Sequence, residues 1–177
     1  MTMDAVPADC AHILNAPLMQ QIVHVESGGN PYAIGVVGGR LVRQPRNLPE
    51  AVATVQMLEQ MGRNYSIGSG QINRVHFGRL GWKNDIARGF DVCTNIRASL
   101  GVLQLCYEKA LRAQYPAAPR NGAYGAVHAA LSCYYSGDLR LGATLGYVSK
   151  VLNAQPAAAQ RKAQANPHVF TNSGSEP

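Results

Sequence analysis

Charge is scarce in this sequence, and several features that would mark a function are missing. Charged residues make up 15% of the 177 residues, and ten of them are carboxylates. No stretch approaches the ~20 apolar residues of a membrane-spanning helix, so we expect no membrane span. Lysine and arginine form no run longer than Arg161-Lys162, and no DNA- or RNA-binding motif is present. We therefore expect no nucleic acid partner, although the net charge of +6 favours an anionic one, such as an acidic cell-wall polymer.

A secretory signal peptide is not visible either. Residues 1–4 lack the basic and apolar regions that such a signal requires. A mature protein whose signal has been removed would look the same. The sequence pattern alone therefore leaves the compartment open.

The cysteines are few and widely spaced. Cys10, Cys93, Cys106 and Cys133 form no CxxC pair and no metal-ligand spacing, which argues against a metal site. An even number fits two disulfides in an oxidising compartment, and four buried free cysteines are the alternative. Cys93 and Cys106 are not expected to pair, because about 13 residues of one helix span about 20 Å. Two pairings stay open: Cys10–Cys93 with Cys106–Cys133, or Cys10–Cys106 with Cys93–Cys133.

The spacing of apolar residues predicts one mainly helical α+β domain over residues 10–152. Residues 32–45 predict a small β-hairpin, because two short apolar stretches flank Gly38-Gly39 as a turn. Residues 1–9 are expected to form an N-terminal segment, and residues 153–177 a disordered tail. Further helices are expected over residues 49–62, from 95 to 111, over 122–135 and, interrupted by glycines, over 139–152.

Glu26 stands apart from the other carboxylates. It lies at the end of an apolar-periodic segment that Asn15 is expected to cap and that Gly28-Gly29 should end. A carboxyl group among apolar residues has a raised pKa, because desolvation disfavours its charged form. Such a glutamate can donate a proton near neutral pH. The alternative is an ordinary surface glutamate in a last helical turn.

The segment Gly68-Ser69-Gly70-Gln71-Ile72-Asn73, called here the 68–73 loop, is the second candidate. Its glycines would let the backbone approach a ligand closely, and the amides of Gln71 and Asn73 suit sugars that carry N-acetyl groups. The alternative is a glycine-rich turn whose polar side chains satisfy its own backbone.

Three tyrosines form the third candidate group. Tyr134 and Tyr135 end a predicted helix, and Tyr147 follows Gly146. Their rings could stack on sugars, or their hydroxyls could bind a catalytic carboxylate. Ordinary core and surface aromatics are the alternative.

Together, in this order, these segments resemble the motifs of lytic transglycosylases of the soluble, goose-lysozyme-like type. The resemblance rests on Glu26-Ser27-Gly28 before Asn30-Pro31, the 68–73 loop, the helix end at Tyr134 and the late Tyr147-Val148. Residues 33–36, 91–95 and 131–134 make the chain similar to the subgroup that serves type IV secretion systems. Two departures stand out. Ser69-Gly70 replaces the usual Leu-Met or Leu-Gly, and Tyr135 replaces the usual asparagine, whose amide would contact substrate.

The resemblance implies a lysozyme-like fold, no cofactor and a periplasmic location. Its substrate would be peptidoglycan glycan strands, with secretion-system components as possible partners. Glu26 would be the sole general acid and base, with Ser27 as its structural companion and with Tyr134 and Tyr147 orienting its carboxyl. The residues expected at the substrate are Ser27, Ser69, Gln71, Asn73, Tyr134, Tyr135 and Tyr147.

The implied reaction needs one carboxylate only. Glu26 would protonate the glycosidic oxygen and then, as a base, take the proton of the 6-hydroxyl to close a 1,6-anhydro ring. An ordinary glycosidase needs a second carboxylate at about 5–9 Å, and Asp138, the nearest by motif, follows Gly137 in a turn. A hydrolytic muramidase and a non-catalytic wall-binding scaffold are the alternatives.

Overall fold

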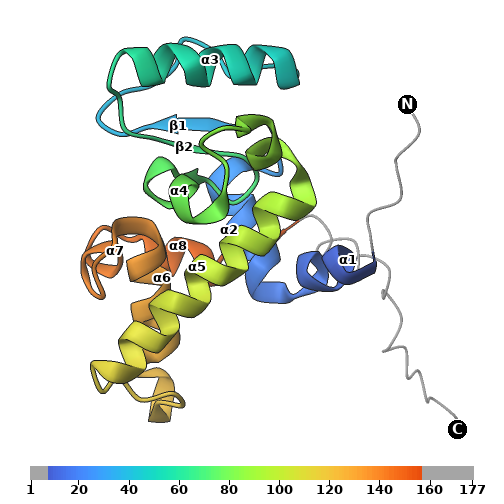
Figure 1. The fold of residues 1–177 in the computed structure, drawn as a ribbon. Helices are drawn as coiled ribbons and strands as arrows, with labels where there is room; N and C mark the ends of the chain where they lie inside the picture. The colour runs from blue at the N-terminus through green and yellow to red at the C-terminus, as the bar shows by residue number, and fades with distance from the viewer. Residues whose placement is uncertain (1–7, 157–177) are drawn as a thin grey trace, which may run out of the picture.

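The computed structural model describes residues 8–156, and helix α5 lies at the centre of the fold. Figure 1 shows α5 crossing the molecule, with α3 and the strands on one side and α6, α7 and α8 on the other. The helices are α1 (Ala8–Asn15), α2 (Pro17–Ser27), α3 (Leu48–Gln60), α4 (Phe77–Leu80), α5 (Val92–Arg112), α6 (Ala126–Ser136), α7 (Leu141–Thr144) and α8 (Tyr147–Leu152). The strands are β1 (Ile34–Val36), β2 (Tyr65–Ile67) and β3 (Ile72–Asn73), and short 3₁₀ turns cover Arg74–His76, Ile86–Phe90 and Arg120–Gly122. The mainly helical α+β class is therefore confirmed.

Helix α2 forms much as predicted. Proline occupies its first turn, where the missing N–H costs nothing. The capping position is Ala16, because Asn15 is the last residue of α1, a helix that the pattern did not predict. Gly28 ends α2 in the left-handed conformation with φ of 62°. Glu26 thus lies in the last turn of α2.

The predicted β-hairpin over residues 32–45 is wrong. Strand β1 pairs antiparallel with β2, and β2 pairs with β3, in the order β1-β2-β3. Residues 40–43 form no strand. Instead, the amide side chain of Gln44 occupies the outer edge of β1. It accepts from the N–H of Ile34 at 2.8 Å and donates to the carbonyl of Ile34 at 2.9 Å.

Capping side chains account for the starts of α3 and α5. Helix α5 starts three residues before the predicted position, because the Asp91 carboxylate accepts from the backbone N–H of Thr94. Asn47 caps α3 in the same way through the N–H of Glu50. The last predicted helix is two helices, α7 and α8, and Gly146 separates them with φ of 82°.

The buried apolar side chains form two main clusters, one on each side of α5. The first joins α3, the sheet and the aromatic rings of Phe77, Trp82 and Phe90. The second joins α2, α5, α6 and α8 and includes Ile22, Ile96, Leu131 and Tyr147. Glu26 lies on the helix that forms one wall of this second cluster.

Both disulfides tie a helix to α5. Cys10 on α1 bonds to Cys93, and Cys106 bonds to Cys133 on α6. The first of the two open pairings is therefore the correct one. The second disulfide fixes α6, which carries Tyr134 and Tyr135, against the central helix.

The predicted terminal segments fall mainly outside the described residues. Residues 1–7 and 157–177 are not described. Helix α8 ends at Leu152, and the side chain of Gln21 donates to the carbonyls of Leu152 and Ala154. Within residues 8–156, no helix is both long and apolar enough to cross a membrane.

Candidate active site

The Glu26 carboxyl group is held by a tyrosine from the far end of the chain. The hydroxyl of Tyr147 donates to Oε1 of Glu26 at 2.5 Å, across 121 residues of sequence. Tyr147 itself is 6% exposed at the start of α8. The side chain that the sequence placed near Glu26 is therefore in direct contact with it.

Burial raises the pKa of Glu26 from 4.5 to about 7. The hydrogen bond from Tyr147 and the positive charge of Lys150 oppose this rise, because both favour the carboxylate. Lys150 lies on α8, one turn beyond Tyr147, and was not among the predicted site residues. A glutamate with a pKa in this range can both donate and accept a proton near neutral pH.

Tyr134 does not hydrogen-bond to Glu26. Burial raises the pKa of the Tyr134 phenol, and the charge of Glu26 raises it further. Its hydroxyl donates instead to the carbonyl of Gly70 at 2.6 Å. The prediction that Tyr134 orients the carboxyl is thus wrong in its direct form, because its hydroxyl is used to hold the 68–73 loop.

Three helices hold the 68–73 loop through its backbone at Ser69 and Gly70. The hydroxyl of Ser27, on α2, donates to the carbonyl of Ser69 at 2.8 Å. The side chain of Asn95, on α5, accepts from the N–H of Gly70 at 2.7 Å, and Tyr134 on α6 binds the carbonyl of Gly70. Ser27 follows Glu26 directly in sequence. The loop is therefore fixed relative to the Glu26 carboxyl.

Asn95 is a site residue that the sequence analysis did not identify. It is fully buried, and its amide nitrogen donates to the carbonyls of Ile67 and Gly89 while its oxygen binds the N–H of Gly70. An unpaired buried amide is costly, so three satisfied bonds indicate a structural role in fixing the loop. The available signal was its place at the start of α5, within the Asp91-Val92-Cys93-Thr94-Asn95 segment.

The glycines of the loop are required by contacts within the protein. A Cβ atom at Gly70 would lie 1.9 Å from Oγ of Ser99 and 3.0 Å from the hydroxyl of Tyr134. A Cβ atom at Gly68 would lie 2.2 Å from the Asn95 amide. Ser69, between them, is 3% exposed. These contacts explain the two glycines by packing within the protein, and not by the close approach of a ligand that the sequence suggested.

The amides of Gln71 and Asn73 bind the protein. Nε2 of Gln71 donates to the carbonyls of Ala33 and Gly68, each at 3.0 Å, and these bonds support its φ of 51°. Asn73 donates to Asn64 and Ser66 and accepts from the N–H of Val75. Both side chains hydrogen-bond to groups of the protein itself, which agrees with the alternative of a glycine-rich turn that satisfies its own backbone. Neither residue is fully buried.

Tyr135 is the most exposed aromatic residue of the site. Its side chain is 52% exposed and stacks on the ring of Tyr147, with centroids 4.5 Å apart and an angle of 16° between the planes. One face of Tyr135 therefore covers the residue that binds Glu26.

Other carboxylates have structural partners. The pKa of Glu50 is lowered to about 2, mainly by the hydrogen bond from Arg43, and that of Asp138 is lowered by the backbone N–H groups of Arg140 and Leu141. Glu59 pairs with Arg74 and accepts from Tyr65. Among the described residues, no second carboxylate contributes to the pKa of Glu26, and no three metal-ligating side chains meet.

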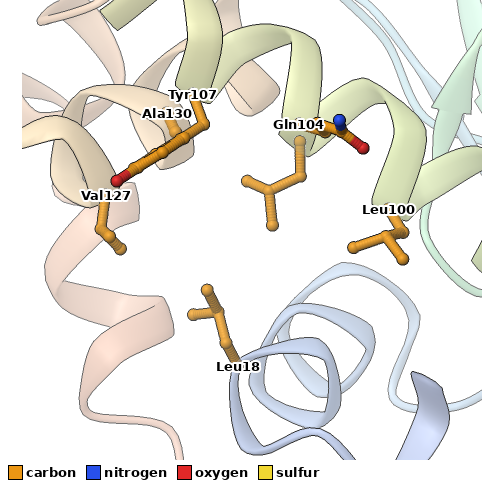
Figure 2. A pocket seen from close by; sticks show the side chains of 7 residues that line it. Leu18, Leu100, Gln104, Tyr107, Val127 and Ala130 are labelled. Carbon is orange, nitrogen blue, oxygen red and sulfur yellow. The ribbon is translucent and has the colours of Figure 1, made fainter. Parts of the chain in front are cut away.

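A separate apolar pocket lies away from Glu26, between α2, α5 and α6 (Figure 2). Its volume is about 260 Å³. None of the predicted site residues lines it, and it holds no carboxyl group, so it does not suit glycoside chemistry. The lining residues are Leu18, Leu100, Leu103, Gln104, Tyr107, Val127 and Ala130.

The comparisons with known proteins agree on one family. The Transglycosylase SLT domain matches residues 8–154. Proteins named type IV secretion system protein virB1, from Brucella abortus, Brucella melitensis and Brucella suis, are 43% identical over 148 residues, which cover 81% of this chain. The chain spans 59% of the length of these relatives. No solved structure matches the chain.

Proposed function

Since the chain belongs to the family of SLT-domain transglycosylases, we propose that it is a peptidoglycan lytic transglycosylase. It cleaves the β-1,4 bond between N-acetylmuramic acid and N-acetylglucosamine and leaves a 1,6-anhydro end. The observation that carries this proposal is the largely buried Glu26 carboxyl group, which accepts a hydrogen bond from Tyr147 and whose pKa burial raises to about 7.

The chemistry follows from one residue acting twice. Protonated Glu26 gives its proton to the glycosidic oxygen as the bond to the anomeric carbon breaks, while the substrate's own 2-acetamido group assists at that carbon. The resulting carboxylate then takes the proton of the 6-hydroxyl, whose oxygen bonds to the anomeric carbon. The proton that left Glu26 is thereby replaced, and no water is consumed.

Tyr147 positions the carboxyl for both steps. Its hydrogen bond favours the carboxylate form and so stabilises the state between the two proton transfers. Ser27 and the 68–73 loop form the adjacent wall. We assign the substrate contacts to the exposed Tyr135 and the partly exposed Gln71 and Asn73, whereas Ser69 is too deeply buried to offer its side chain.

The virB1 relatives carry the words type IV secretion system in their names. We infer that this chain acts in the periplasm and opens peptidoglycan locally for a secretion apparatus. The support for this is the sequence identity over most of the chain and two disulfides, which form in oxidising compartments.

The first prediction tests Glu26. In Glu26→Gln we expect the release of anhydro-muropeptides from purified peptidoglycan to fall by about 10³-fold or more, because the amide cannot donate the proton. Binding to the polymer should remain. Glu108→Gln is the matched control, since Glu108 lies on the surface of α5, where its partners are the amide of Gln104 and, at 4.0 Å, Arg112.

Mass spectrometry of the products separates the alternatives. Anhydro products lie one water below the reducing-end products of a hydrolytic muramidase. If the wild type released products with reducing ends, the enzyme would be a hydrolase and not a transglycosylase. Equal activity in wild type and Glu26→Gln, or none in either with binding intact, would overturn the assignment of Glu26 as the acid.

A further inference from the structure

The stacked pair of Tyr135 and Tyr147 links an exposed ring to the buried carboxyl group. Tyr135 is 52% exposed and Tyr147 is 6% exposed, and their planes are nearly parallel at 4.5 Å between centroids. The hydroxyl of Tyr147 donates to Glu26. Tyr147 thus lies between Tyr135 and Glu26, and Tyr135 covers the ring of Tyr147 that would otherwise meet solvent.

The two tyrosines come from different helices. Tyr135 is in the last turn of α6, and Tyr147 is the first residue of α8. Stacked aromatic rings attract each other beyond the effect of the area that they bury. The stack therefore helps to fix the position of the Tyr147 ring, and with it the direction of the hydroxyl group.

We propose that Tyr135 is a positioning residue, which holds Tyr147 against the Glu26 carboxyl and keeps water away from that hydrogen bond. This role differs from a direct substrate contact, because it acts through Tyr147 and exists in the free protein. Its consequence for catalysis rests on the proposed function, whereas the contact itself does not.

The groups that face Glu26 define what Tyr135 can change. Tyr147 and Lys150 come from α8, and Tyr134 comes from α6. Burial is the largest cause of the raised pKa of Glu26, while Tyr147 and Lys150 act against it. Removing the Tyr135 ring admits water beside Tyr147. The carboxylate then becomes easier to form, so the pKa of Glu26 falls.

The test measures Glu26 directly, without substrate. The protein is labelled with ¹³C at the glutamate side-chain carboxyl carbons, and the signal of Glu26 among the five glutamates is the one absent from Glu26→Gln. We expect Tyr135→Ala to lower the titration midpoint of Glu26 by about one unit. Tyr135→Phe keeps the ring and should leave the midpoint unchanged. Val127→Ala, which removes another exposed apolar side chain from α6, should also leave it unchanged.

The same variants are then assayed for product release as a function of pH. In Tyr135→Ala the loss of rate with rising pH should begin about one unit earlier, together with a fall in kcat, whereas Val127→Ala should keep the pH profile of the wild type. A midpoint in Tyr135→Ala equal to that of the wild type, with only KM raised, would overturn the positioning role and leave a substrate contact. An equal shift in Tyr135→Phe would overturn it too, because the hydroxyl and not the stacked ring would then be responsible.

Failure of the proposed function is distinguishable from failure of this inference. If the wild type releases no anhydro product, the titration still shows whether Tyr135 acts on Glu26 through Tyr147. If anhydro product forms but the midpoint does not move, the enzyme stands and the role of Tyr135 does not.

Discussion

At the scale of single residues, the behaviour of the site depends on the proton of Glu26. Burial holds that proton on the carboxyl group, and the Tyr147 hydroxyl and Lys150 oppose it. The balance places the pKa at about 7, so small changes in hydration alter the protonated fraction at physiological pH. A group with such a pKa can act as an acid and then as a base within one reaction.

The raised pKa also predicts how stability depends on pH. The folded protein binds the Glu26 proton more tightly than the unfolded chain, whose pKa is 4.5. The resulting stabilisation is complete below pH 4.5 and is lost as the pH rises through about 7. Glu26→Gln lacks this titration, so well above pH 7 we expect it to be more stable than the wild type by about 3 kcal/mol.

Urea unfolding of both proteins between pH 4 and 9 measures this difference. Glu108→Gln should follow the wild type at every pH, since its carboxylate lies at the surface. Parallel curves for wild type and Glu26→Gln across the whole range would contradict the prediction. They would mean that Glu26 is as well hydrated in the folded protein as in the unfolded chain.

Single residues could be predicted where their neighbours in the structure are also their neighbours in the sequence. Glu26 could be singled out because its apolar neighbours and the Gly28-Gly29 stop are adjacent in sequence. Asn95 could not be, because its partners Ile67, Gly70 and Gly89 come from other segments. For the same reason the sequence could not show that the Tyr134 hydroxyl binds Gly70 and not the Glu26 carboxyl.

At the scale of elements, helices followed from local pattern and strands did not. Helices α2, α3, α5 and α6 were predicted because their apolar spacing and capping residues are local signals. The partner of β1 is β2, which begins 31 positions after the start of β1. Gly38-Gly39 resembles a hairpin turn, but residues 40–43 leave the sheet and only the Gln44 side chain returns to it.

The Cys106–Cys133 disulfide predicts how the elements of the site are coupled. Its loop of 27 residues should stabilise the fold by about 3 kcal/mol through the unfolded state. Cys106→Ala with Cys133→Ala should therefore lower the free energy of unfolding by about this amount. Activity should fall as well, because α6 carries Tyr134 and Tyr135. Denaturant unfolding and product release measure the two effects.

Cys10→Ala with Cys93→Ala is the matched comparison. Its longer loop of 83 residues gives a slightly larger expected loss, by about 1 kcal/mol, from the same relation. This disulfide holds α1, which carries none of the predicted site residues, so catalysis should be affected less at a temperature where both variants are folded. Equal losses of activity in the two double variants would show that α6 is not held specifically by its disulfide.

At the scale of the whole molecule, two apolar clusters lie on opposite sides of α5, and the site forms where they approach each other. Tyr134 packs against both clusters, and its hydroxyl holds the 68–73 loop. Glu26 comes from the α2–α8 side, and the loop comes from the sheet side. The relative position of the two clusters therefore determines how the Glu26 carboxyl group lies against the 68–73 loop.

The net charge of +6 predicts how binding of the protein to an acidic polymer depends on salt. Attraction to an acidic cell wall is screened by salt, since the Debye length falls from about 10 Å at 0.1 M to about 3 Å at 1 M. We expect the amount of Glu26→Gln that sediments with purified peptidoglycan to fall at least threefold between about 50 mM and 500 mM sodium chloride. The inactive variant is used so that the polymer is not digested during the measurement.

If binding came from a neutral cleft alone, the amount bound would not depend on salt. Binding that is independent of salt would therefore contradict the role of charge. Peptidoglycan whose peptide carboxyl groups have been amidated is the matched control. Its binding should be weaker at low salt and nearly independent of salt thereafter.

The Gln44 side chain also determines which associations the sheet permits. An exposed strand edge is a template on which a foreign strand can be added, in recognition or in aggregation. Here the outward N–H and carbonyl of Ile34 are both occupied by one amide group, and β1 is only three residues long. This edge therefore offers no register for an incoming peptide, and the sheet is protected at this point from unspecific strand exchange.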